Sequence, residues 1–469
     1  MRKDINLKTM LGSHGIGQPT VIKKTSKNNM QKRNFILLIA FLALIVIGFL
    51  IFLYSRNAPT DENRDGGNVV SFVSEFFSFG KNRNQNGDPK TPSDISDYRD
   101  ESIAEVEKMI LTKVSTVPIA GYGVFTKERF IDLPTSAPSD TPQTETATTP
   151  SAPLTEFVAT LRYVDKATGN ILQTYADRID ERKLSDTIVL GVREALFGNK
   201  TDAVIMRYLR PDNVTIATFI GKLPADVLGG DASTTKLTGS FLPENVTDVS
   251  VSADSSKIFY LYNINDGAMG MTASVLGENK TQVLDSAFTE WLSEWPTTET
   301  IALTTKASGG APGYMYTLGS NSKELHKALG NIYGLTTLSS PDGKLVLYGN
   351  NNLSLNIYNI ETREIRSLNI STLPEKCVWS KNSTLLYCSV PKYIGQTLYP
   401  DAWYQGEVSF NDQLWKIEIE NPIGIILSDP KLVGVGEEID GIKLALSENE
   451  DYLFLINKKD SYLWELRLK

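Results

Sequence analysis

Two cysteines, Cys377 and Cys388, are the side chains whose spacing most directly implies chemistry. They bracket the segment CVWSKNSTLLYC, which is typical of two short apolar strands joined by a tight turn. A two-residue turn at Asn382 and Ser383 would put the cysteines opposite each other, whereas a shifted register would displace them diagonally by two residues. Outside the cytoplasm such a pair can oxidise, so a disulfide and two buried thiols remain as alternatives.

Five aromatic side chains lie in one insertion, residues 391–411. They are Tyr393, Tyr399, Trp403, Tyr404 and Phe410. Aromatic residues on a loop that a rigid scaffold supports are typical of sites that bind peptide or glycan. They can equally pack over the end of the fold as a lid. We therefore treat them as a candidate partner-binding loop, with the packed lid as the alternative.

Patterns for catalysis and metal binding are sparse. The chain has 2 Cys and 2 His, and its histidines, His14 and His326, are far apart in the sequence. The carboxylates of Glu437, Glu438 and Asp440 could flank a glycosidic bond, but acidic loop residues are common. The sequence therefore predicts no catalytic residue, no metal and no cofactor, and the expectation is that the protein is not an enzyme.

The net charge of −8 averages two different regions. Residues 1–34 hold eight basic residues and one acid, whereas the remainder is strongly acidic, which argues against nucleic-acid binding. Between them, residues 35–54 (FILLIAFLALIVIGFLIFLY) carry no charge and are long enough as a helix, about 30 Å, to cross a lipid bilayer. We expect an uncleaved single-pass signal anchor in the cell membrane, with residues 1–34 as a basic cytoplasmic tail and the C-terminal part outside the cytoplasm.

Two further segments have the composition of linkers. Residues 55–113 are rich in Asn, Asp, Gly, Pro and Ser, which predicts a disordered linker. Within it, residues 69–80 (VVSFVSEFFSFG) form a short amphipathic segment that we expect either to dock on the following domain or to rest on the outer leaflet. Residues 134–153 are rich in Pro and Thr and predict a disordered loop extruded from the folded domain.

Residues 114–469 repeat one pattern, an apolar strand, a polar turn that begins with serine, and a second apolar strand. The serines that mark it are Ser252, Ser340, Ser380 and Ser447, spaced 88, 40 and 67 residues apart. Units of about 40–46 residues with four short strands are typical of β-propeller blades. The sequence predicts an all-β fold, a single β-propeller of about seven four-stranded blades. We expect residues 462–468 to close the ring against the strand near 119–125.

One blade supports a family resemblance. The run SSPDGKLVLYGNN followed by LNIYNIETREIRSL resembles the WD-like repeat of TolB-type β-propellers, whose hallmark is a Ser-Pro-Asp-Gly-Lys turn. Residues 160–172, 294–318 and 399–417 are similar to segments of single-pass, membrane-anchored bacterial propeller proteins of uncharacterised function. The resemblance covers residues 114–469 and implies a WD-like propeller at the cell envelope, but little about activity.

These features favour a membrane-anchored extracytoplasmic propeller that acts as a protein-interaction or ligand-binding scaffold. Its expected partners are the lipid bilayer, through residues 35–54, and an envelope or surface protein or a glycan. A transmembrane sensor or regulator is the first alternative, although the 34-residue tail has no recognisable effector domain. A surface-polymer hydrolase that uses carboxylates at the propeller channel is the second.

Overall fold

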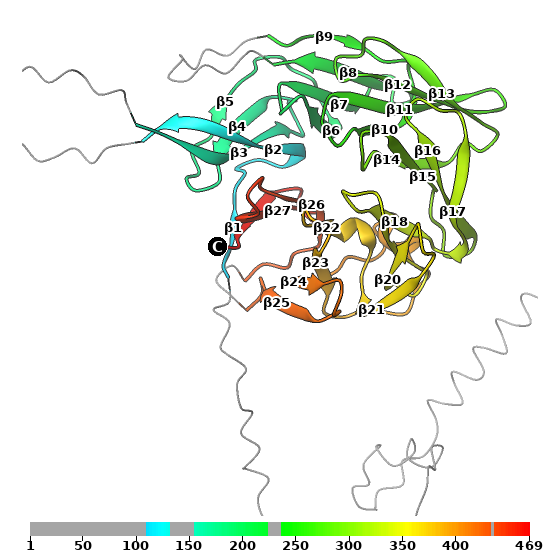
Figure 1. Ribbon diagram of the computed structural model, residues 1–469. Coiled ribbons are helices and arrows are strands. Elements are labelled where there is room, and N and C mark those ends of the chain that lie inside the picture. The colour runs from blue at the N-terminus through cyan, green and yellow to red at the C-terminus, as the bar shows by residue number, and fades with distance from the viewer. Residues whose placement is uncertain (1–108, 132–153, 224–235, 433–435) are drawn as a thin grey trace, which may run out of the picture. The chain divides into compact units, whose positions relative to one another are not determined.

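A computed structural model describes residues 109–131, 154–223, 236–432 and 436–469. They form seven antiparallel sheets of four strands each, arranged around one axis as the blades of a propeller (Figure 1). This confirms the predicted all-β propeller of seven blades. Residues 1–54, the segment 69–80 and the loop 134–153 lie outside the described residues. In the part of the chain that is described, no helix has the length and apolar character needed to cross a bilayer.

The first three blades run from an inner strand at the axis to an outer strand at the rim. Blade 1 consists of β2 (Ile119–Phe130), β3 (Thr155–Asp165), β4 (Ile171–Tyr175) and β5 (Arg182–Lys183). Blade 2 consists of β6 (Val192–Gly198), β7 (Ala203–Leu209), β8 (Ile216–Lys222) and β9 (Thr238–Phe241). Blade 3 consists of β10 (Val246–Val251), β11 (Lys257–Ile264), β12 (Gly267–Ser274) and β13 (Thr281–Ser286).

The next three blades follow the same order. Blade 4 consists of β14 (Trp291–Glu294), β15 (Thr300–Thr305), β16 (Pro312–Gly319) and β17 (Leu325–Tyr333). Blade 5 consists of β18 (Thr336–Ser339), β19 (Leu345–Gly349), β20 (Ser354–Asn359) and β21 (Ile365–Ser371). Blade 6 consists of β22 (Cys377–Trp379), β23 (Leu385–Pro391), β24 (Asp412–Glu418) and β25 (Gly424–Ser428). Two short helices belong to this region of the chain. The helix η1 (Pro374–Lys376) directly precedes β22, and α2 (Asp401–Tyr404) lies between β23 and β24.

Blade 7 joins the two ends of the propeller. From the axis outward its strands are β26 (Gly441–Leu446), β27 (Tyr452–Asn457), β28 (Leu463–Arg467) and β1 (Leu111–Lys113). The predicted closure against residues 119–125 is therefore wrong, because those residues belong to β2, the inner strand of blade 1. The real partner, β1, was hard to recognise because it has three residues and lies before residue 114, in the predicted linker. Leu111 holds it in place, buried in a cluster with Trp464.

The repeated serine has a structural reason. In blade 5, the buried Ser340 Oγ accepts the N–H of Leu345 at 2.9 Å and donates to Asp342 at 2.6 Å. The hydroxyl therefore closes the turn between the first two strands of the blade. The other marker serines accept the equivalent N–H, five residues on, at 2.9 to 3.0 Å: Ser252, Ser380 and Ser447.

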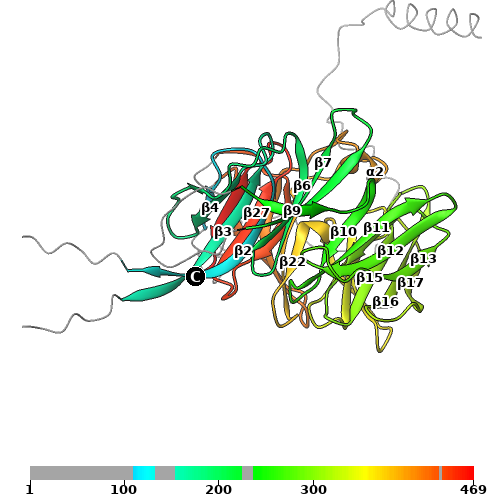
Figure 2. The same ribbon diagram turned by 90° about the horizontal axis from the view of Figure 1, so that it is seen from above.

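The strand order defines two faces of the ring. The face where the inner strands begin, here the upper face, carries the links between blades and the loops between second and third strands. The lower face carries the serine turns. Seen from above the first view, β2 and β3 extend from the disc as a two-stranded ribbon (Figure 2). Apolar clusters fill the spaces between neighbouring blades, so each blade is buried on both faces.

Candidate functional site

The two cysteines meet in blade 6. Cys377 and Cys388 are register partners on β22 and β23, and their sulfurs form a disulfide. In the same hairpin, the N–H of Ser380 donates to the carbonyl of Leu385, so these two residues form a hydrogen-bonded pair. Hydrogen-bonded and non-hydrogen-bonded pairs alternate along an antiparallel ladder, so the cysteines form a non-hydrogen-bonded pair, in which the two backbones lie closer together. Their Cα atoms are 4.0 Å apart. Both cysteines are buried in the cluster between blades 5 and 6.

The insertion of residues 391–411 divides its five aromatic residues between the core and the surface. Tyr399, Trp403 and Phe410 are buried in one cluster with Leu353 and Leu373 of blade 5. By contrast, the side chain of Tyr393 is 81% exposed and that of Tyr404 is 39% exposed. The predicted binding loop is therefore a packed cover in its centre, with two tyrosines left at its surface.

The insertion reaches across the upper face beyond its own blade. Gly309 of blade 4 donates its N–H to the carboxylate of Asp401 at 2.5 Å. On the other side, the indole N–H of Trp403 donates to Asp440, which immediately precedes β26 of blade 7. The ammonium of Lys458 donates to the Trp403 carbonyl oxygen at 2.6 Å. The insertion therefore bridges blades 4 to 7 and can hold its exposed residues in fixed positions.

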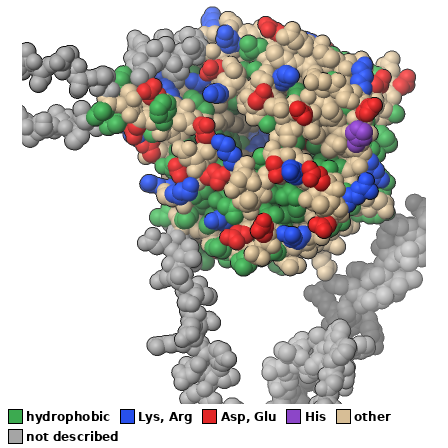
Figure 3. All heavy atoms as spheres, in the orientation of Figure 1, with side chains coloured by type: hydrophobic (Ala, Val, Ile, Leu, Met, Phe, Trp, Pro, Cys, Tyr) green, Lys and Arg blue, Asp and Glu red, His purple; other side chains and the backbone are tan. Residues whose placement is uncertain are grey.

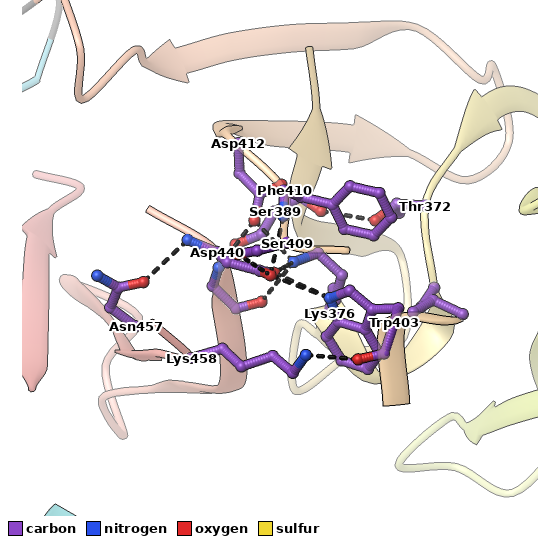
Figure 4. Close-up of polar contacts among 12 residues, drawn as sticks. Thr372, Lys376, Ser389, Trp403, Ser409, Phe410, Asp412, Asp440, Asn457 and Lys458 are labelled. Atoms are coloured by element: carbon purple, nitrogen blue, oxygen red, sulfur yellow. Dashed lines mark hydrogen bonds and ion pairs between the residues drawn. The ribbon is translucent and has the colours of Figure 1, made fainter. Parts of the chain in front are cut away.

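A buried ion cluster lies beneath this cover (Figure 4). The ammonium nitrogen of Lys376, at the end of η1, lies 2.7 Å from Asp412 and 2.5 Å from Asp440, and all three side chains are 0% exposed. Asp440 also accepts hydrogen bonds from Trp403 and from the backbone of Phe410, both at 3.0 Å. Because two carboxylates share one lysine, three segments meet at this cluster: the link into blade 6, the link into blade 7 and the end of the insertion.

The two carboxylates of the cluster titrate differently. Burial and the neighbouring charge of Asp440 raise the pKa of Asp412 to about 6, although Lys376 opposes the shift. Burial also opposes ionisation of Asp440, but Lys376 and the hydrogen bonds from Phe410 and Trp403 hold the pKa of that carboxyl below its ordinary value. Asp440 is therefore the carboxylate that keeps its charge, and Asp412 is the one that gains a proton first.

More carboxyl groups line the inner strands near the axis. Asp248 on β10 accepts the N–H of Ser293 on β14 at 2.7 Å. In the same way Glu294 accepts the N–H of Ser339 on β18 at 2.8 Å. Each carboxyl thus joins its inner strand to that of the next blade.

Two of the glutamates near the axis have pKa values close to neutrality. Burial raises the pKa of Glu294 to about 7, and the charge of Glu375 adds to the shift. Burial likewise raises the pKa of Glu375 to about 7, while the hydroxyl of Tyr404, which donates to it at 2.6 Å, opposes the shift. Each of these carboxyl groups can therefore gain or lose a proton near pH 7.

The carboxylates that the sequence suggested for glycoside chemistry do not come together. Asp440 is buried in the ion cluster, whereas Glu438 is at the surface, bound to Lys431 and Lys459. Glu437 pairs with Lys113. Within the described ranges, no three His, Cys, Asp or Glu side chains are placed to hold a metal ion. The acids that gather near the axis are instead Asp248 and Glu294 on inner strands and Glu375 in η1. None of these three was predicted as a site residue.

No protein-family model and no curated protein matches the chain. Similar solved structures include an oligogalacturonate lyase in complex with manganese, with 11% sequence identity and a TM-score of 0.42. The match covers 66% of this chain and 85% of that one. Another is the tricorn protease, with 13% identity and a TM-score of 0.33, covering 64% of this chain and 27% of that one. At these identities the likeness concerns the fold alone.

The comparison corrects one expectation. The expectation that the protein is not an enzyme does not stand, because an oligogalacturonate lyase, an enzyme with a similar propeller, is among the similar structures. The lyase's own activity is not carried over to this chain. The seven four-stranded sheets establish the β-propeller scaffold.

Proposed function

We propose that residues 35–54 anchor the protein in the cell membrane and that its propeller lies outside the cytoplasm, where it binds an envelope or surface protein or a glycan. The observation that carries the location is the buried disulfide between Cys377 and Cys388. Disulfides persist in oxidising compartments and are rare in the reducing cytoplasm. We also propose that the propeller belongs to the TolB-type family with WD-like repeats.

The binding surface that we propose is the exposed part of the insertion. Tyr393 and Leu398 are 81% and 52% exposed, and Tyr404, in the same insertion, is 39% exposed. The buried ion cluster and the contacts with blades 4 and 7 fix the segment that carries them. Aromatic and apolar groups that are already ordered lose little conformational entropy on binding, which favours their use as contacts.

Site-specific crosslinking in intact cells tests this proposal. A photoreactive amino acid at Tyr393 should crosslink to one or a few envelope components. The same group at Glu361, in a lower-face turn of blade 5, serves as the matched control. Equal crosslinking patterns at both positions, or none at Tyr393, would contradict binding at the insertion. Labelling of an introduced surface cysteine by a membrane-impermeant reagent tests the location independently.

A second candidate function rests on Glu294 and Glu375. Their pKa values of about 7 suit proton transfer at neutral pH, which supports a surface-polymer hydrolase at the propeller channel. If so, purified protein should cleave envelope polysaccharide, and Glu375→Gln should abolish the cleavage. A transmembrane regulator is the remaining alternative, and it predicts that deletion of residues 1–34 changes a cellular response without loss of crosslinking at Tyr393.

A further inference from the structure

The upper face of blade 2 has a pocket that is separate from the insertion. The pocket has a volume of about 240 Å³ and is lined by Arg193, Glu194, Arg207, Tyr208, Leu209 and Ile216. These residues come from the start of β6, the end of β7 and the start of β8. Apolar atoms make up most of its wall, and its size suits a single side chain rather than a drug-sized ligand.

The charged groups at the pocket have an excess of positive charge. Glu194 is paired twice, with Arg207 at 2.6 Å and with Lys443 of blade 7 at 3.1 Å. Burial alone would raise the pKa of Glu194, but these two cations hold it below its ordinary value, so the group is ionised. Asp248 also lies near Glu194 and Arg207. With Arg193 included, three cations face two carboxyl groups.

One arginine there is unpaired, and a second has one donor without a partner. The exposed Arg193 makes no hydrogen bond or ion pair with any other residue in the described ranges. The Nε atom of Arg207 is buried and without a hydrogen-bond partner, although the other nitrogens of that guanidinium are bonded to Glu194 and to the backbone of β10. A buried donor without a partner costs free energy that an acceptor on a ligand can recover.

We propose that this pocket binds an apolar group that carries a carboxylate, such as the C-terminal leucine of a peptide or a small acyl amino acid. The apolar wall of Tyr208, Leu209 and Ile216 would receive the aliphatic part. The guanidinium of Arg193 is free to pair with the carboxylate, because a planar fork of N–H donors matches two carboxylate oxygens. An amide in place of the carboxylate loses this pairing.

The two sources of the ligand differ in what else they contact. A free acyl amino acid would use the pocket alone, whereas a peptide C-terminus would also pass over the surrounding upper face. N-acetyl-leucine and a six-residue peptide that ends in leucine therefore serve as the two probes, each with its C-terminal amide as a control. If the peptide binds more tightly than N-acetyl-leucine, the natural ligand is the C-terminus of a protein partner. If the two affinities are equal, the natural ligand is a small molecule.

Isothermal titration calorimetry on the full chain in detergent micelles tests the proposal. We expect N-acetyl-leucine to bind with a Kd on the order of 1 mM, given its few heavy atoms. The amide should bind about tenfold more weakly, and Arg193→Gln should weaken binding of the acid by a similar factor. Arg363→Gln, at an exposed lower-face turn, is the matched control and should leave affinity unchanged.

Three results would overturn the proposal. Equal binding of the acid and its amide would exclude carboxylate recognition, and unchanged affinity in Arg193→Gln would exclude this pocket. No heat change at 10-fold the expected Kd, about 10 mM, would exclude the ligand class. Since Arg193 is exposed, the variant should fold normally, which a thermal melt can verify. The crosslinking test at Tyr393 is independent, so either proposal can fail without the other.

Discussion

The ammonium nitrogen of Lys443 lies 3.1 Å from a carboxylate oxygen of Glu194, although their strands belong to blades 7 and 2, on either side of blade 1. Lys443 has a positive φ of 51° and sits at a register shift in β26, between Ile442 and Ala445. Such a bulge redirects a side chain. The interaction therefore links two blades that are not neighbours, near the axis of the ring. On the face drawn in Figure 3, basic and acidic side chains are interspersed.

Replacement of Lys443 by Asn separates its backbone role from its charge. Asn tolerates positive φ, so the bulge should remain, but its side chain is too short to reach Glu194. Both partners are partly exposed, and we expect a loss of no more than about 1 kcal/mol in the free energy of unfolding. Denaturant unfolding at low and high salt measures it. A loss that persists unchanged at 1 M salt would contradict a mainly electrostatic link.

The ion cluster predicts a much larger effect for Lys376→Met. The substitution leaves Asp412 and Asp440 buried without their cation, which should cost about 3–5 kcal/mol in the free energy of unfolding. Tryptophan fluorescence should also change, because Trp403 donates to Asp440. Lys392→Met is the matched control, since Lys392 is partly exposed beside Asp429. Equal losses in the free energy of unfolding for the two variants would contradict a larger cost for removing the buried cation.

The raised pKa of Glu294 predicts how stability depends on pH. Its folded pKa of about 7 lies above its ordinary value of 4.5, so the folded protein binds more protons between these values and stability is lost as pH rises from about 4.5 to about 7. Glu294→Gln keeps an acceptor for the Ser339 N–H and removes the charge. The variant should melt higher than wild type at pH 8 and equally at pH 4. A pH-independent difference would contradict this assignment.

The disulfide should stabilise the propeller measurably. Cys377 and Cys388 are 11 residues apart, and closing a loop of this length restricts the unfolded chain by about 3 kcal/mol in the chain-entropy model. A Cys377→Ala and Cys388→Ala double variant should lose most of this free energy of unfolding. Because both sulfurs are buried, reductant should act on the wild type only when it unfolds. Rapid reduction of the folded protein would contradict the burial.

The strand pattern was predictable because it is local. The turn that begins at Ser340 depends on a hydrogen bond to Leu345 five residues away, so its signal repeats wherever the turn does. The register of Cys377 with Cys388 likewise follows from one short hairpin. Ring closure was not predictable in detail, because β1 has only three residues and pairs with β28, more than 300 residues later in the chain.

The site was harder to predict for the same reason. The aromatic residues of the insertion were recognisable from composition, but their division into buried Trp403 and exposed Tyr393 depends on the blades beneath. No local pattern in the sequence marks Lys376 as a buried cation. Its partners, Asp412 and Asp440, are 36 and 64 residues further along.

The sequence by itself thus determined the seven-fold repeat, the chemistry of its turns and the cysteine pair, because each depends on residues within one blade. Only the tertiary structure decided that Lys376 joins two carboxylates, that Glu294 and Glu375 share a charged environment, and that Lys443 reaches Glu194. These interactions depend on which blades are neighbours around a closed ring. Charge and burial at such positions are properties of the assembled ring, and no local pattern of residues records them.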